Sequence, residues 1–177
     1  MLTTVQTAGE AFARFEAFLA EDRLIQNGWH QEKDGRHLAC ALGVLGDEID
    51  APSKCPAQIM PRWLAKMVPW IFDRLPFEEA TDWGRQFYEQ LARLDGKVPF
   101  SVVYDWQANV VTAGVIEAAT VAQRDPAAHQ KLQALHLRAL QGDTAPRAEW
   151  HEVLKSAYAY ADADAYADAY ADAYADA

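Results

Sequence analysis

The chain has 177 residues, enough for one domain with an appendage and a substantial apolar core. Its 26 acidic residues outnumber its 16 basic residues, which gives a formal net charge of -10 at pH 7. This acidity disfavours non-specific binding to nucleic acids or anionic membranes, because both are negatively charged, and it favours a protein partner with a basic surface.

Two sequence features predict a cytoplasmic location. Cys40 and Cys55 are too few for a disulfide framework in a chain of this length, which favours a reducing compartment. The N-terminal MLTTVQTAGE lacks the basic region and the apolar run of a signal peptide, and no stretch has the apolar length of a membrane helix. We therefore expect a soluble cytoplasmic protein.

Helical spacing of apolar residues organises the first half of the chain. Residues 5–25 predict a helix that stops at Asn27-Gly28, and the polar residues 29–35 predict a loop. A short helix is expected from Leu38 to Leu45. Residues 56–76 are densely apolar but interrupted by proline, which predicts two short helices or a bent one at the centre of the core.

The second half continues the same pattern. Residues 77–94 predict an amphipathic helix, residues 99–123 a buried helix, and the segment after Asp125-Pro126 a leucine-rich helix. Pro146 suits the first turn of a last helix that continues toward the C-terminus. The prediction is an all-α fold of six or seven helices, with a helical body over residues 1–145 and a long C-terminal helix over 146–177.

The last twenty residues, 158–177, use only Ala, Tyr and Asp, with Ala at every second position. Alternation suits a strand or a helix, but Ala is a strong helix former and is depleted in strands, so a projecting helix is favoured. On that helix tyrosines and aspartates occupy opposite faces. The tyrosines are Tyr158, Tyr166, Tyr170 and Tyr174, and the aspartates are Asp162, Asp164, Asp168, Asp172 and Asp176.

Each face of the tail suggests a different role. The tyrosine row predicts self-association into a homodimer, because two apolar stripes can pack together. The aspartate row predicts a rod of negative charge that binds a basic groove in a partner protein. A low-complexity extension without a function is the remaining alternative.

Candidates for chemistry are few. His37 and Cys40, with Cys55 or His30, match no common zinc spacing, and Cys40 is better explained as a buried thiol in an apolar run. The acidic pair Asp47 and Glu48 is expected at a helix start or a turn. The sequence thus predicts no catalytic residue, metal or cofactor.

His129 and His136 are predicted on a solvated helix face, and an aromatic ligand pocket could be built by Trp63, Trp70 and Trp106.

The ending ADADAYADAYADAYADA and the overall acidity resemble small accessory proteins of bacteriophages, including acidic DNA mimics. The stretch HLACALGVLGDEIDAPSKCPAQIMPRWLAKM, residues 37–67, is similar to segments of uncharacterised phage proteins. The resemblance implies an inhibitor that occupies the DNA path of a host enzyme such as DNA gyrase, a topoisomerase, without binding nucleic acid itself. The alternatives are an assembly protein that dimerises through its tyrosines, and a small-molecule-binding protein or enzyme with an aromatic pocket.

Overall fold

The structure, a computed structural model, describes residues 2–159 and divides the chain into two compact units. The N-terminal unit ends at Val98 and the C-terminal unit begins at Pro99. This boundary lies inside residues 1–145, which the sequence predicted to be one helical body. Each unit is described below by itself.

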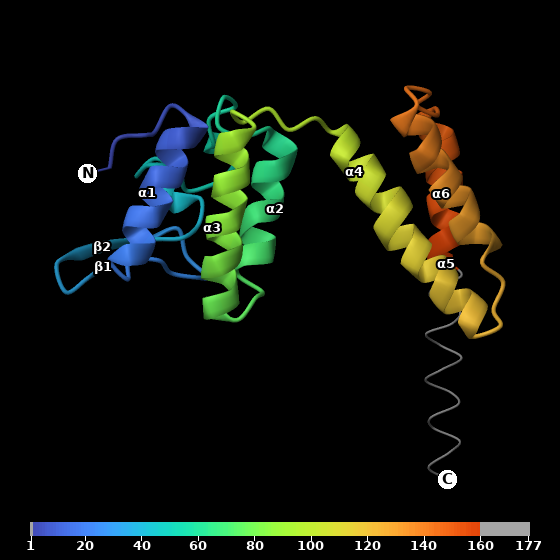
Figure 1. The fold of residues 1–177 in the computed structure, drawn as a ribbon, viewed down its shortest axis with the longest axis horizontal. Helices are drawn as coiled ribbons and strands as arrows, with labels where there is room; N and C mark the ends of the chain where they lie inside the picture. The colour runs from blue at the N-terminus through green and yellow to red at the C-terminus, as the bar shows by residue number, and fades with distance from the viewer. Residues whose placement is uncertain (1, 160–177) are drawn as a thin grey trace, which may run out of the picture. The chain divides into compact units, whose positions relative to one another are not determined.

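Three helices form the frame of the N-terminal unit: α1 (Ala8–Ala20), α2 (Arg62–Phe72) and α3 (Phe77–Arg93). Helix α3 packs against both of the others, as Figure 1 shows. A capping box starts α1, because the Thr7 hydroxyl accepts from the Glu10 amide at 3.1 Å and the Glu10 carboxylate accepts from the Thr7 amide at 3.3 Å. Helices were predicted in all three regions.

The core of this unit combines one face of each helix with the segment around residues 39–49. Phe15 of α1 lies against Gly84 of α3, where a Cβ atom would come within 2.5 Å of the Phe15 ring. The buried Tyr88 hydroxyl donates to the Ala41 carbonyl oxygen at 2.5 Å and so ties α3 to that segment. The region 56–76, expected at the centre of the core, supplies only part of it.

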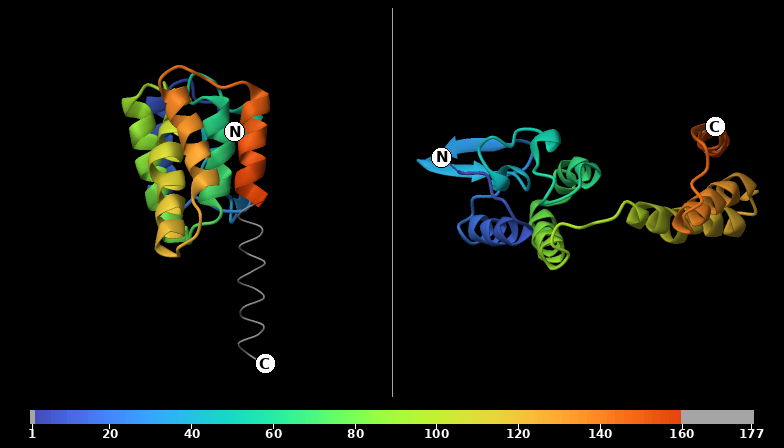
Figure 2. Two further views of the ribbon diagram at one scale, coloured as in Figure 1. Left: turned by 90° about the vertical axis from the view of Figure 1, so that its right-hand side faces the viewer. Right: turned by 90° about the horizontal axis from the view of Figure 1, so that it is seen from above.

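The segment between α1 and α2 corrects two sequence predictions. Residues 29–35 were expected to be a loop and residues 38–45 a helix, but the chain forms an antiparallel hairpin of β1 (His30–Lys33) and β2 (Arg36–Ala39). Asp34 and Gly35 have φ of 54° and 71°, as a two-residue hairpin turn requires. Two short 3₁₀ helices follow, η1 (Gly43–Leu45) and η2 (Pro52–Lys54). Figure 2 gives two further views of these elements.

The proline-interrupted region 56–76 forms one helix, α2. Pro61 occupies its N-cap, where the missing amide hydrogen costs nothing, and Pro69 lies inside the helix. Of its tryptophans, Trp70 is 60% exposed, so this part of the predicted aromatic pocket faces solvent.

The C-terminal unit begins with one continuous helical rod, made of α4 (Ser101–Trp106), the π-helical turn η3 (Gln107–Val111) and α5 (Thr112–Val121). Helix α6 (Ala127–Leu140) packs against all three segments of the rod. The predicted helix at 99–123 is confirmed, but its predicted burial is wrong. Only Ala108 and Thr112 are buried in the rod, whereas Trp106 is 48% exposed.

A last helix covers residues 147–159 up to the end of the described chain, so the start of the predicted C-terminal helix is confirmed. Tyr158 is 68% exposed. The other predicted tail residues, Tyr166, Tyr170, Tyr174, Asp162, Asp164, Asp168, Asp172 and Asp176, lie outside the described residues. Over residues 2–159 the fold is all-α apart from the hairpin, in agreement with the predicted fold class. Across residues 2–159 no helix combines the length and the apolarity needed to cross a membrane.

Candidate metal site

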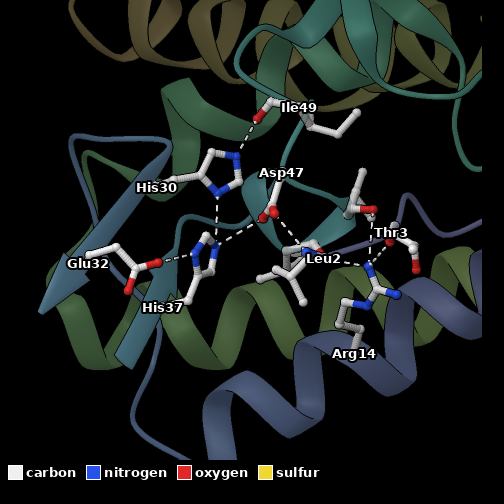
Figure 3. A network of polar contacts seen from close by, with 10 residues as sticks. Leu2, Thr3, Arg14, His30, Glu32, His37, Asp47 and Ile49 are labelled. Atoms are coloured by element: carbon white, nitrogen blue, oxygen red, sulfur yellow. Dashed lines mark hydrogen bonds and ion pairs between the residues drawn. The ribbon is translucent and has the colours of Figure 1, made fainter. Parts of the chain in front are cut away.

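The hairpin brings His30, Glu32 and His37 to one face. His30 and Glu32 are two apart on β1, so their side chains point the same way. His37 on β2 is the cross-strand partner of Glu32, and its Nδ1 lies 2.9 Å from Glu32 Oε1. The two imidazoles are therefore diagonal neighbours, with His30 Nδ1 3.3 Å from His37 Nε2 (Figure 3).

Asp47 joins this face from the turn after η1. The backbone amide of Leu2 donates to Asp47 Oδ2 at 2.7 Å, and the Asp47 amide donates to the Leu2 carbonyl oxygen at 3.2 Å. This pairing leaves Asp47 Oδ1 directed at His37, 3.4 Å from Nε2. His30, His37 and Asp47 each place one ligand atom within 4.8 Å of the others.

Two glycines allow these segments to approach so closely. A Cβ atom on Gly43 would lie 2.3 Å from the Trp29 carbonyl oxygen and 3.1 Å from the His30 ring. A Cβ atom on Gly46 would lie 2.8 Å from the Thr4 Cα, on the N-terminal segment that pairs with Asp47. The chain around Thr4 is held further by Arg14, whose Nη1 donates to the Thr3 carbonyl oxygen at 2.6 Å.

Hydrogen bonding fixes the tautomer of both histidines. His30 Nε2 lies 3.0 Å from the Ile49 carbonyl oxygen, which can only accept, so this nitrogen carries the hydrogen. His37 Nδ1 faces the Glu32 carboxylate, so it is the protonated nitrogen of that ring. In their neutral forms the rings therefore direct lone pairs from His30 Nδ1 and His37 Nε2 toward each other.

With both rings neutral, three electron-pair donors thus converge without a hydrogen between them. The third is Asp47 Oδ1, a buried atom that has no hydrogen-bond partner among the described residues. An unpaired buried carboxylate oxygen is costly, and two facing imidazole lone pairs repel. A cation placed among the three atoms would relieve both penalties.

The outer contacts have the form found around protein-bound metals. Metal-binding histidines usually donate their second ring hydrogen to a carboxylate or a backbone carbonyl, which orients the ring and raises its basicity. Glu32 fills this role for His37, and the Ile49 carbonyl fills it for His30. The His37 and Asp47 side chains are each 24% exposed, so both lie near the surface although Asp47 Oδ1 itself is buried.

From the sequence, a cluster of His37 and Cys40 with Cys55 or His30 was weighed and not favoured, whereas the structure brings His30 and His37 together with Asp47. Cys40 lies outside the cluster as a buried thiol that accepts from the Gly43 amide, at 3.4 Å, as its apolar surroundings predicted. His37 and Cys40 were placed on one helix, whereas His37 belongs to β2. Asp47 was noted only as an acidic turn residue. The turn signal Asp34-Gly35, with histidines on either side, is what could have indicated the cluster.

Another predicted feature is corrected in the C-terminal unit. His136 was expected on a solvated face but is 9% exposed, because Tyr104 and Trp150 pack on its ring with centroids 6.1 and 4.9 Å away.

Comparison of the chain with protein-family models, curated proteins and solved structures finds no match.

Proposed function

We propose that the N-terminal unit is a metal-binding module that holds one divalent transition-metal ion with His30, His37 and Asp47. The observation that carries this proposal is the convergence of three lone pairs, one of them on a buried carboxylate oxygen that accepts no hydrogen bond within residues 2–159. Three protein ligands leave a fourth position for water or an external ligand, as in zinc sites that perform chemistry.

Zinc fits the two distances that meet at His37. Zinc bonds of about 2.0–2.1 Å in a tetrahedron place neighbouring ligand atoms about 3.3–3.4 Å apart. The 3.3 Å between the imidazole nitrogens and the 3.4 Å from His37 Nε2 to Asp47 Oδ1 match two of the three edges, and the third, from His30 to Asp47, is within 4.8 Å. An octahedral ion with bonds of about 2.1 Å would bring neighbouring ligand atoms to about 3.0 Å.

A second proton on His37 is the competing explanation. An imidazolium would donate from Nδ1 to Glu32 and from Nε2 toward both His30 Nδ1 and Asp47 Oδ1. The two explanations differ in one measurable respect, because only the first gives specific zinc affinity.

Calorimetric titration of the untagged full-length chain with Zn²⁺ tests the proposal. We expect one ion per chain, and a tetrahedral Co²⁺ spectrum on substitution. His37→Gln should weaken binding by more than about 100-fold, and the outer-shell change Glu32→Gln by about 10- to 100-fold. The matched control is His151→Gln, which removes an exposed imidazole from the other unit. Absence of binding, or equal binding by His37→Gln, would refute the module.

A second candidate function rests on the tail. We propose that the chain is also an acidic DNA mimic of the phage type, which inhibits a host DNA-binding enzyme such as DNA gyrase. The supporting observation is the placement of five aspartates between Asp162 and Asp176, which carry half of the net charge of -10. Aspartates spaced by four on a helix recur about every 6 Å, against about 3.4 Å between phosphates on one DNA strand. Two such helices side by side would come closer to that charge density.

Gyrase supercoiling and DNA-binding competition test this candidate. A variant with four aspartates changed to Asn keeps side-chain size and removes four charges, so it should lose most of the inhibition, and inhibition by the parent should weaken steeply with salt. Changing three tyrosines to Phe is the control and should matter much less. Full inhibition by the Asn variant would exclude phosphate mimicry. The changed residues are Asp164, Asp168, Asp172, Asp176 and, in the control, Tyr166, Tyr170, Tyr174.

A further inference from the structure

The N-terminal segment of residues 2–5, which we call the strap, is fastened to the turn that carries Asp47. Leu2 pairs with Asp47 in both directions, because its amide donates to Asp47 Oδ2 at 2.7 Å and its carbonyl oxygen accepts from the Asp47 amide at 3.2 Å. At the other end the Val5 amide donates to the Leu45 carbonyl oxygen at 2.9 Å. The Val5 side chain belongs to the core, and Leu2 packs against it. The strap is thus held at both of its ends.

Arg14 of α1 ties the middle of the strap to the same turn. Its Nη1 donates to the Thr3 carbonyl oxygen at 2.6 Å and to the Leu45 carbonyl oxygen at 3.3 Å, so one guanidinium nitrogen joins the two segments (Figure 3). A displacement of the strap therefore disturbs the turn that positions Asp47.

The Asp47 carboxylate is shared between the strap and the proposed metal site. Its Oδ2 accepts from Leu2, whereas Oδ1 lies 3.4 Å from His37 Nε2, at the metal site. Because both oxygens belong to one planar group, turning Oδ1 away from His37 also turns Oδ2 away from the Leu2 amide. Hydrogen bonds to metal-binding carboxylates orient them, and such outer contacts contribute strongly to metal affinity.

With neutral histidine rings and no metal, the position of Asp47 is unfavourable. Its Oδ1 is buried, faces the lone pair of His37 Nε2 and accepts no hydrogen bond within residues 2–159. Rotation of the carboxylate toward water would remove this cost, but it would also break the bond that fastens Leu2. A bound ion reverses the balance, because it attracts Oδ1 inward and keeps Oδ2 in place for the amide.

We propose that residues 2–5 are a zinc-controlled strap, which the metal fastens through Asp47 and which loss of the metal loosens. The inference rests on the proposed zinc site and states what that site regulates. An open strap exposes the apolar side chains of Leu2 and Val5 and the part of the core that they cover. By linkage, a fastened strap strengthens zinc binding by the same factor by which zinc strengthens the fastening.

Removal of a single backbone hydrogen tests the coupling from the side of the metal. Leu2→Pro lacks the amide that donates to Asp47 Oδ2, and Leu2→Ala is its matched reference, since it also loses the leucine side chain but keeps the amide. In calorimetric titration of the full-length chains, Leu2→Pro should bind Zn²⁺ about 10- to 100-fold more weakly than Leu2→Ala. Gly84→Ala, which strains the α1–α3 contact in the same unit, should bind zinc as the unaltered chain does.

Amide hydrogen exchange of the unaltered full-length chain tests the coupling from the side of the strap. With ¹⁵N-labelled valine, Val5 reports opening of the strap, and Val68, buried inside α2, reports opening of the whole unit. Without zinc the Val5 amide should exchange faster than the Val68 amide, and saturating Zn²⁺ should slow it about tenfold or more. Val98 is the control, because its amide donates to the Gly96 carbonyl oxygen in a local turn away from the site, so its rate should not change.

The outcomes separate the strap from the metal-binding module. If the unaltered chain binds no zinc, the module is wrong and the strap falls with it. If the chain binds zinc, equal affinities of Leu2→Pro and Leu2→Ala overturn the strap alone. Should Leu2→Pro fail to fold, the exchange rates decide. A Val5 rate that zinc leaves unchanged, or that does not exceed the Val68 rate in the zinc-free chain, overturns the strap.

Discussion

The Cys55 thiol is packed so that burial raises its pKa to about 12, and burial likewise raises the pKa of Cys40. Thiolate is the form that reacts with alkylating agents, so both thiols should be nearly inert in the folded chain. At pH 8 we expect Cys55 to react with iodoacetamide on the order of a thousand-fold more slowly than an exposed cysteine. The rate should rise about tenfold per pH unit, because the thiolate fraction grows tenfold per unit below the pKa.

Mass spectrometry of labelled protein gives these rates. Labelling in denaturant is the control and should be fast and equal at both positions. Rapid labelling of Cys55 in the folded chain at pH 8 would show that the thiol is more accessible or more acidic than its surroundings indicate.

At the scale of single residues, local sequence context predicted some environments and missed others. Cys40 was predicted to be buried because its sequence neighbours are apolar, and it is. His136 was predicted to be solvated because its own helix has a polar face, but Tyr104 and Trp150 reach it from other helices. Asp47 was missed for the same reason, since its partners lie on a hairpin and at the N-terminus. Contacts between distant segments leave no periodic trace in the sequence.

Among the elements, the contact between α1 and α3 depends on Gly84. Gly84→Ala would bring a Cβ atom within 2.5 Å of the buried Phe15 ring, so the two helices must separate or the ring must move. We expect a loss of about 1–3 kcal/mol in the free energy of unfolding of the N-terminal unit, measured by denaturant titration. This would outweigh the gain in helix propensity of up to about 1 kcal/mol that Ala brings.

Gly9→Ala is the matched control, because it makes the same change in α1 where no atom lies within 4 Å of the added Cβ. It should leave the stability unchanged or raise it slightly. Equal effects of the two changes would show that the α1–α3 contact is looser than the side-chain packing indicates.

The sequence predicted correctly whether a segment is a helix or a strand where its periodic apolar pattern was long. The helix predicted at 77–94 corresponds to α3 (Phe77–Arg93), because several turns of apolar spacing identify a helix strongly. The hairpin was missed because its strands have only four residues each and carry charged side chains on both faces. The pair Asp34-Gly35 is the turn signal there, and a short polar stretch that contains such a pair predicts a loop equally well.

For the whole molecule, the division at Val98 predicts two unfolding transitions. Each unit has its own buried residues, and units of this kind usually unfold as separate cooperative steps. In differential scanning calorimetry Gly84→Ala should lower only the transition of the N-terminal unit. Gly114→Ala, which lies in α5 with open space around the added Cβ, should raise only the other.

Zinc should separate the same two transitions and connect one of them to the proposed metal site. Zinc at a hundred times its dissociation constant stabilises the binding unit by about 2.7 kcal/mol, which shifts the midpoint of a unit of about 100 residues on the order of 10 °C. We expect Zn²⁺ to raise only the transition that Gly84→Ala lowers. The zinc shift should disappear in His37→Gln. A single transition that responds as a whole to both glycine changes would show that the two units fold as one, whatever zinc does.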